Sequence, residues 1–214
     1  MSYIYDHGGD VYSQQSKLID FSININPLGL PPSVKKAAED AISACESYPD
    51  YSCRRLREAI SQRYDVRPDN IICGNGASDL IYRLFSALKP ELSLLTAPSF
   101  SEYAKGVYVC GGQIKWHRLR EDEGFEITER ILDDLSPDVR LVFLCNPNNP
   151  TGRLISRELL NKIAEKCAAQ ETYFALDECF IELSEGHNLS LKDLIKDKPN
   201  LFILRAFTKD YAMP

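Results

Sequence analysis

Two ionisable side chains come after apolar stretches of the sequence. Asp177 ends the segment TYFALD, and Lys209 ends the segment LFILRAFTK. A carboxylate beside an apolar run is costly unless it is paired, and the protonated ring nitrogen of a cofactor would keep Asp177 ionised. Partial desolvation and nearby cations favour Schiff-base formation by a lysine such as Lys209. The alternatives are a helix cap at Asp177 and an ordinary solvated Lys209.

Two further segments could assist such chemistry. Gly74-Asn75-Gly76-Ala77-Ser78 follows an apolar run and precedes a helical pattern, so its backbone N–H groups could bind a phosphate, although glycine turns are also common as tight connections. The segment NPNNPTG at 146–152 contains two prolines and a glycine, which fix a rigid path. We expect it to hold Asn149 as a hydrogen-bond donor, unless its amides only satisfy the local backbone.

The elements that position these residues alternate between strands and helices. We predict strands at 71–73, 92–97, 113–119, 140–145, 172–177 and 201–206. Helices are predicted from a Ser33 cap to about 47, over 53–64, and along apolar stripes at 80–88 and 159–167. Several strands are apolar throughout, which predicts an α/β fold with a mostly parallel, mixed sheet and helices on both faces. Ligands in such sheets bind outside the carboxyl ends of the strands, and the four segments described above follow predicted strands.

Composition limits the possible partners and compartments. The net charge is −6 at pH 7, with acidic and basic residues interspersed, so nucleic acid is an unexpected partner. No apolar run approaches the ~20 residues that cross a bilayer. Seven cysteines without a CxxC pair, and an N-terminus without a signal-peptide pattern, indicate a cytoplasmic protein. We expect no metal site. We divide the chain into an N-terminal arm with a substrate-contact loop, 1–32, and a large domain, 33–214.

The order of these segments resembles the fold-type I pyridoxal-phosphate (PLP) enzymes of the aspartate aminotransferase superfamily. The combination of NPNNPTG, the DE-x-F element at 177–180 and the Thr-Lys pair at 208–209 is more specific than any one motif. Within that superfamily the chain resembles the branch of histidinol-phosphate aminotransferases and threonine-phosphate decarboxylases. The resemblance implies PLP as the cofactor, with Lys209 in the Schiff base, Asp177 on the pyridine nitrogen and Asn149 on the O3′ oxygen.

The same resemblance assigns the remaining cofactor contacts. The cofactor phosphate would be held by residues that follow two of the predicted strands (strand exits), namely Gly76, Ala77, Ser78 and Thr208. Phe100 falls where the family has an aromatic residue stacked on the ring, and Tyr103 is a second candidate for that position. Tyr48 matches a tyrosine that reaches the phosphate of the neighbouring subunit's cofactor, which implies a homodimer.

Three features of the sequence separate the two subfamilies. Phe180 stands where many aminotransferases of this branch have a tyrosine that helps to hold O3′, and the segments HGG (7–9) and DFSININPLG (20–29) resemble the decarboxylases. The resemblance then implies a phosphorylated amino-acid substrate. L-threonine O-3-phosphate would be decarboxylated to (R)-1-amino-2-propanol O-2-phosphate for cobalamin biosynthesis, with His7 and Asn26 as substrate contacts. A histidinol-phosphate-type aminotransferase and an inactive fragment or PLP-fold binding module are the alternatives.

The sequence stops where the family would continue. The resemblance implies a further Gly-Leu-Arg segment after Pro214, a last strand, and a small C-terminal domain that carries the arginine for the substrate carboxylate. We therefore expect the 214-residue chain to be truncated, to bind PLP weakly and to show little or no turnover.

Overall fold

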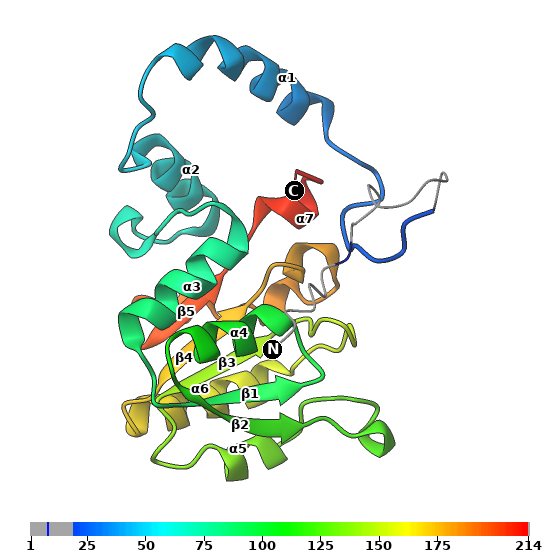
Figure 1. Cartoon of the computed structure of the whole chain (residues 1–214), viewed down its shortest axis with the longest axis vertical. Coiled ribbons are helices and arrows are strands. Elements are labelled where there is room, and N and C mark those ends of the chain that lie inside the picture. Colours follow the sequence, from blue (N-terminus) through cyan, green and yellow to red (C-terminus); the bar gives the residue numbers. More distant parts are fainter. Residues whose placement is uncertain (1–7, 9–18, 214) are drawn as a thin grey trace.

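A five-stranded parallel sheet forms the centre of the computed structural model, which describes residue 8 and residues 19–213 (Figure 1). Its strands are β1 (Leu92–Ala97), β2 (Gln113–Arg118), β3 (Leu141–Cys145), β4 (Tyr173–Asp177) and β5 (Leu201–Leu204). They lie in the order β2-β1-β3-β4-β5, and every described pairing is parallel. The predicted α/β architecture is confirmed.

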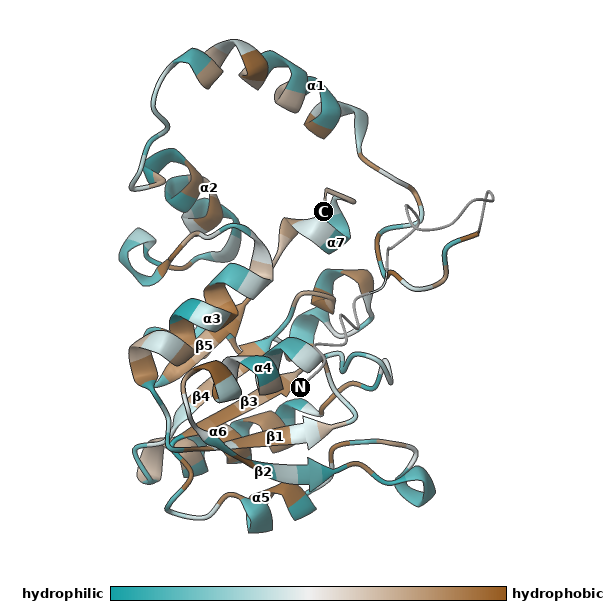
Figure 2. Ribbon diagram, in the orientation of Figure 1, coloured by the Kyte–Doolittle hydropathy of each residue, from teal (hydrophilic) through white to brown (hydrophobic). Residues whose placement is uncertain are grey.

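Helices cover both faces of this sheet because successive strand residues point to opposite sides. One face packs against α3 (Gly76–Leu88) and α4 (Ser101–Val109), with Phe143 of β3 beside Phe85 of α3. The other face packs against α5 (Arg130–Asp134) and α6 (Arg157–Ala169), with Val142 and Leu144 in that core. Figure 2 shows the apolar strands between helices whose outer surfaces are hydrophilic.

The strand order changes direction between β1 and β3. The chain passes from β1 outward to β2 and then returns to place β3 on the other side of β1. The connections that leave β1 and β3 therefore diverge, and in sheets of this kind a crevice opens at the carboxyl ends of the two diverging strands. The carboxyl ends of β1, β3, β4 and β5 carry most of the residues considered above.

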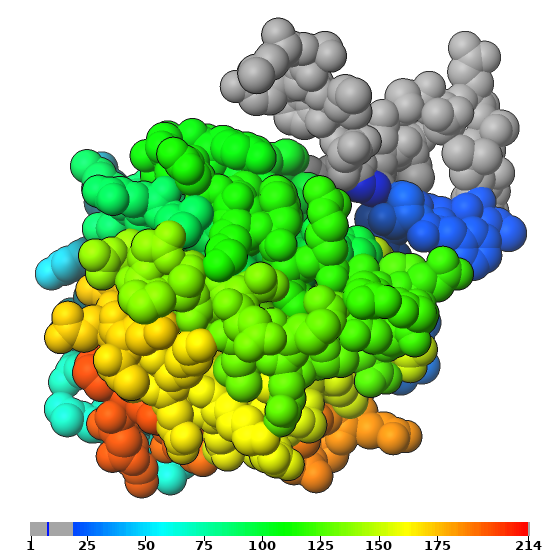
Figure 3. Space-filling view, turned by 90° about the horizontal axis from the view of Figure 1, so that it is seen from below, coloured from blue at the N-terminus to red at the C-terminus, as the bar shows by residue number. Residues whose placement is uncertain are grey.

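The N-terminal part of the described chain curves over one end of the sheet (Figure 1). It contains α1 (Pro32–Ala41), η1 (Ile42–Glu46), α2 (Arg54–Tyr64) and η2 (Pro68–Asn70), and α1 has no buried residue. The space-filling view of Figure 3 shows the blue N-terminal segment at the margin of a face formed by the green and yellow parts of the chain. The short helix α7 (Phe207–Asp210) follows β5.

The remaining elements are single turns of 3₁₀-helix. They are η3 (Glu121–Glu123), η4 (Ile181–Leu183), η5 (His187–Leu189) and η6 (Lys192–Leu194). The last three form the connection between β4 and β5. No helix within residues 19–213 is long and apolar enough to cross a membrane.

Two local predictions were wrong. Ser33 does not cap the first helix, because the helix begins at Pro32 with Pro31 as its N-cap; proline suits the first helical position, where its missing N–H is not needed. The segment 71–73 is not a strand. Its residues have the composition of a strand, but a strand also requires a hydrogen-bonded neighbour, and the cavity described below lies between this segment and β5.

Candidate active site

Asp177 is a buried carboxylate at the end of β4. Its side chain is 4% exposed. The backbone N–H of Cys179 donates a hydrogen bond to Oδ1 at 2.9 Å, and the hydroxyl of Tyr103 donates one to Oδ2 at 2.7 Å. Burial raises the pKa of the Asp177 carboxyl, against the opposing effects of these hydrogen bonds and of the charge of Lys209. Among the described residues, no cationic side chain forms an ion pair with Asp177, so its negative charge lacks a direct partner.

Tyr103 is held rigidly beneath this carboxylate. It lies in the first turn of α4, is 1% exposed, and its ring stacks on Phe143 with 4.3 Å between centroids. Phe100, the N-cap of α4, meets Tyr103 edge-on at 5.6 Å. Burial raises the pKa of the Tyr103 hydroxyl well above its ordinary value, so this group remains a proton donor to Asp177. The sequence singled out Tyr103 only as a candidate for ring stacking and missed this contact.

Lys209 lies at the next strand exit, in α7 after β5. Asp177 and Leu204 are register partners on β4 and β5, so the two exits are adjacent. The Nζ atom of Lys209 lies 5.6 Å from the centroid of the Phe180 ring, and its charge acts on Asp177. The structure therefore brings together three residues that the sequence placed in two separate motifs: Asp177, Phe180 and Lys209.

Asn26 connects the N-terminal segment to the Lys209 turn. Its backbone N–H donates to the carbonyl of Lys209 at 3.0 Å, and its Nδ2 donates to the carbonyl of Asp210 at 2.8 Å. Its Oδ1 accepts from the N–H of Leu28. The predicted substrate contact thus lies beside the predicted cofactor lysine, although the described bonds of its side chain are to the backbone.

The NPNNPTG turn follows β3 and is fixed by Asn148, a residue that the sequence did not single out. Asn148 is 2% exposed, and its Nδ2 donates to the carbonyl of Pro98 at 3.1 Å and to Oγ1 of Thr151 at 2.9 Å. Its Oδ1 accepts from Ser99 at 3.1 Å. These bonds tie the β1 exit to the β3 exit and leave the neighbouring Asn149 half-buried at the same edge of the sheet.

The start of α3 forms an open cradle. Gly76 begins the helix with φ +76°, and a Cβ atom built there meets nothing within 4 Å. Ala77 and Ser78 belong to the first helical turn, whose N–H groups lack intrahelical acceptors. Asp79 accepts a hydrogen bond from the N–H of Asn75 at 2.8 Å and closes the turn. An anion that binds here would be met by backbone N–H groups and the positive end of the helix dipole.

A cavity of about 550 Å³ connects this cradle with β5 and α7. Gly76 and Thr208 both line it, so two of the predicted phosphate contacts face the same space. Its remaining wall is mostly apolar and includes Ile72 and Ile203. Asp177, Asn149 and Lys209 do not line it. A smaller cavity of about 180 Å³ lies beside Phe100 and Tyr103.

Two predicted site residues are not placed at this edge of the sheet. Tyr48 lies between η1 and α2 and is fully exposed, at 102%. Its predicted role requires the cofactor of a second subunit. His7 lies outside the described residues. Within residue 8 and residues 19–213, no group of three or more His, Cys, Asp or Glu side chains could hold a metal ion.

Comparisons with known proteins give a consistent family. A model of the family described as aminotransferase class I and II matches residues 16–214. The threonine-phosphate decarboxylase of Salmonella typhimurium is 39% identical, over 97% of this chain and 59% of the relative. Histidinol-phosphate aminotransferase 2 of Carboxydothermus hydrogenoformans is 34% identical, over 89% of this chain and 53% of the relative.

Solved structures agree with this result. The histidinol-phosphate aminotransferase from Clostridium acetobutylicum aligns with a TM-score of 0.83 and 34% identity, over 92% of this chain and 58% of that one. The L-threonine-O-3-phosphate decarboxylase from Porphyromonas gingivalis aligns with a TM-score of 0.74; at 23% identity this likeness shows the fold alone. The chain spans less than two thirds of the length of each of these relatives.

Proposed function

The chain belongs to the aminotransferase class I and II family, whose members use PLP, and we propose that it carries the cofactor-binding part of a PLP-dependent decarboxylase acting on L-threonine O-3-phosphate. The product would be (R)-1-amino-2-propanol O-2-phosphate, a building block of cobalamin. The observation that carries the cofactor site is the buried Asp177 carboxylate, which has no direct cationic partner among the described residues and lies at the strand exit next to Lys209.

Two features of the chain fit PLP. A protonated pyridine nitrogen would supply the positive partner that the buried Asp177 lacks among the described residues, and Tyr103 and Cys179 already orient both carboxylate oxygens. The cradle at Gly76 has open space where a side chain would otherwise stand, and it begins a helix. A phosphate would fit this position, with Ala77, Ser78 and Thr208 around it.

The roles of the chain's own residues follow from these positions. PLP, when bound, supplies an electron-accepting ring that stabilises negative charge at the α-carbon of an amino acid. Asp177 would hold the proton on the ring nitrogen, and Lys209 would bind the cofactor covalently. The Nζ atom of Lys209 would also serve as the group that carries a proton to the α-carbon. Asn149 would donate to O3′, and Phe100 would support the ring face.

The choice of a decarboxylase is supported by Phe180 and by the relatives. Phe180 lies beside Lys209, where a tyrosine hydroxyl would give O3′ a second donor. Phenylalanine leaves Asn149 as the single proposed donor, as the resemblance to threonine-phosphate decarboxylases implies. The identity of 39% with the Salmonella typhimurium enzyme, against 34% with the Carboxydothermus hydrogenoformans aminotransferase, points the same way.

A carbon dioxide assay distinguishes the proposed decarboxylase from the two alternative functions. The chain is incubated with PLP and carboxyl-labelled L-threonine O-3-phosphate, with and without a 2-oxo acid. Labelled carbon dioxide released without the 2-oxo acid supports the decarboxylase. Transfer of the amino group to the 2-oxo acid supports the histidinol-phosphate-type aminotransferase instead. Bound PLP without either reaction supports an inactive fragment or a PLP-fold binding module.

We also propose that the protein acts as a homodimer. The helix α1 has no buried residue, and Tyr48 and Tyr51 that follow it are fully or almost fully exposed, at 102% and 94%. A second copy would cover the segment from α1 to Tyr51 and would bring its own cofactor to Tyr48 of the first copy. Sedimentation equilibrium should give twice the chain mass of 24.2 kDa, and a monomer at micromolar concentration would contradict this proposal.

A further inference from the structure

A buried ion pair lies beside Asp177 and Lys209 but contains neither. Glu178 directly follows Asp177, and Arg205 follows β5 shortly before Lys209. The Nη2 atom of Arg205 donates to Oε2 of Glu178 at 2.7 Å, and Nε donates to the same oxygen at 3.2 Å. The Glu178 side chain is 0% exposed and the Arg205 side chain 20%. The pair therefore joins the exits of β4 and β5 in the interior.

The remaining acceptor positions of Glu178 are also used. Ser190 donates to Oε2 at 2.7 Å, and the N–H of Leu191 donates to Oε1 at 3.1 Å. The backbone N–H of Glu178 donates to the carbonyl of Leu204 at 2.8 Å. Main chain and side chain thus both fix Glu178 against the end of β5 and the loop that leads to it. A buried carboxylate with all its partners present holds one geometry.

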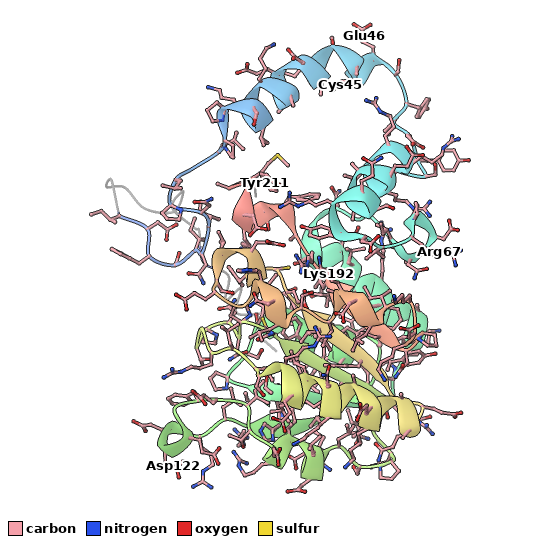
Figure 4. All side chains as sticks on the ribbon, turned by 180° about the vertical axis from the view of Figure 1, so that it is seen from behind. Cys45, Glu46, Arg67, Asp122, Lys192 and Tyr211 are labelled. Carbon is pink, nitrogen blue, oxygen red and sulfur yellow. The ribbon has the colours of Figure 1, made fainter. Side chains whose placement is uncertain are left out.

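Arg205 is fixed from the other side as well. Its Nη1 atom donates to Oε1 of Glu182 at 2.5 Å, and its guanidinium lies over the Tyr64 ring of α2 at 4.8 Å from the centroid. Lys192, labelled in Figure 4, approaches the same ring at 5.5 Å. The arginine is therefore held between the segment that follows β4 and helix α2. Only Ala206, Phe207 and Thr208 separate it from Lys209.

We propose that Glu178 and Arg205 are positioning residues, which hold the Lys209 turn in register with Asp177. This inference rests on the proposed PLP site. A buried ion pair adds little net stability compared with apolar residues of the same volume, so stability alone gives a weak reason for its presence. Its forked geometry, however, fixes the distance between two adjacent strand exits, and a cofactor held at its ring nitrogen and by a lysine requires that distance to be set.

Amine labelling of Lys209 tests the inference without any cofactor. The cofactor-free chain is treated with limiting acetic anhydride, and the labelling rate of Lys209 is measured by peptide mass spectrometry relative to the exposed Lys89. We expect Arg205→Met and Glu178→Gln to raise this ratio by about threefold or more, because the turn then opens locally. Arg130→Met is the matched control, since Nε of Arg130 donates to Oε1 of Glu123 at 2.9 Å and no described hydrogen bond of these two residues involves Glu178, Arg205 or Ser190.

The outcomes distinguish this inference from the proposed function. An unchanged Lys209 ratio in a folded Arg205→Met chain overturns the inference. If Arg205→Met does not fold, the isosteric Glu178→Gln decides in the same way, and Arg205→Lys should restore part of the wild-type ratio. A second readout is the pH profile of the visible absorbance of bound PLP, which should shift in Glu178→Gln and not in Arg130→Met. A changed ratio in a chain that never binds PLP contradicts the proposed function while the coupling between Arg205 and Lys209 stands.

Discussion

The hydroxyl of Tyr103 donates a 2.7 Å hydrogen bond to Oδ2 of Asp177 and thereby joins the first turn of α4 to the end of β4. β1, which precedes α4, is separated from β4 by β3, so this single bond spans the point where the sheet changes direction. Asp177 is consequently oriented before any ligand arrives. Its charge nevertheless has no direct cationic partner among the described residues, which is the condition that a protonated ring nitrogen would satisfy.

Replacing Asp177 by asparagine should make the cofactor-free chain more stable at neutral pH. Burial raises the folded-state pKa of Asp177 above its ordinary value of 3.8. The folded state therefore binds this proton more tightly than the unfolded state, and the contribution of Asp177 to stability falls as pH rises from 3.8 through the folded pKa. Asparagine removes the buried charge, its Oδ1 accepts from the Cys179 N–H, and its Nδ2 donates to the Tyr103 oxygen in place of the bond that Asp177 accepted. The free energy of unfolding at pH 7 should therefore rise by about 1–3 kcal/mol.

Chemical denaturation of both chains from pH 3 to 8 measures this difference, which should disappear at the acid end. The same substitution should weaken PLP binding, since the ring nitrogen then loses its anionic partner. An Asp177→Asn chain that is less stable than the wild type at pH 7 would show that the carboxylate is not strained by burial.

Removing the Tyr103 hydroxyl should have the opposite effect on stability. Tyr103→Phe leaves the Asp177 carboxylate with one donor fewer, and we expect a loss of about 1–3 kcal/mol at pH 7. The loss should be much smaller in the Asp177→Asn background, where no buried charge depends on the hydroxyl. Tyr82→Phe is the control, because Tyr82 donates to Glu102 at 2.7 Å between the neighbouring helices α3 and α4. Equal losses in both Asp177 backgrounds would mean that the two residues are not coupled.

The sequence predicted the parts of this site that depend on local pattern. The apolar residues of α3 and α6 repeat with helical spacing, which predicted these two helices. Asp177 and Lys209 each follow an apolar run, so their places at adjacent strand exits could be expected. The Tyr103 contact could not, because it joins residues 74 apart and depends on how α4 packs across the sheet. Tyr103 also looks like an ordinary core aromatic in the sequence, three residues after Phe100.

The same limit explains the other differences. Arg205 and Glu178 are 27 residues apart, and only the pairing of β4 with β5 brings them together. The segment 71–73 has the residue types of a strand, but whether such residues form a strand depends on a neighbouring backbone that local sequence does not specify. Asn148 and Asn149 are identical in type, and only the fold separates the buried one, bonded to Pro98 and Thr151, from the half-buried one.

The two asparagines should therefore differ when they are replaced. Asn148→Ala removes a side chain that bonds the β1 exit to the β3 exit, and it should lower the free energy of unfolding by about 1–3 kcal/mol. Asn149→Ala should change stability by less than about 0.5 kcal/mol but weaken PLP binding. Urea denaturation and a PLP titration measure the two effects. Equal stability losses for both variants would contradict the assignment of Asn148 as the structural member of the pair.

Gly76→Ala should weaken phosphate binding more than it weakens the fold. The positive φ of 76° disfavours a side chain by about 1 kcal/mol, and the added methyl group would occupy the open space of the cradle. Gly111→Ala carries the same backbone cost, with φ 74° and no atom within 4 Å of the added Cβ, at the distant turn before β2. Both variants should lose similar stability, while only Gly76→Ala raises the Kd for PLP. Equal Kd values would remove Gly76 from the proposed phosphate site.

We propose that the residues after β4 and β5 together hold PLP through Asp177 and Lys209. Borohydride reduction of the chain incubated with PLP, followed by peptide mass spectrometry, checks this attachment, because reduction makes the bond to the lysine permanent. We predict a pyridoxyl-phosphate label concentrated on Lys209 and strongly reduced in Asp177→Asn. A label spread over exposed lysines such as Lys89, or one on Lys209 that is unaffected by Asp177→Asn, would contradict this account.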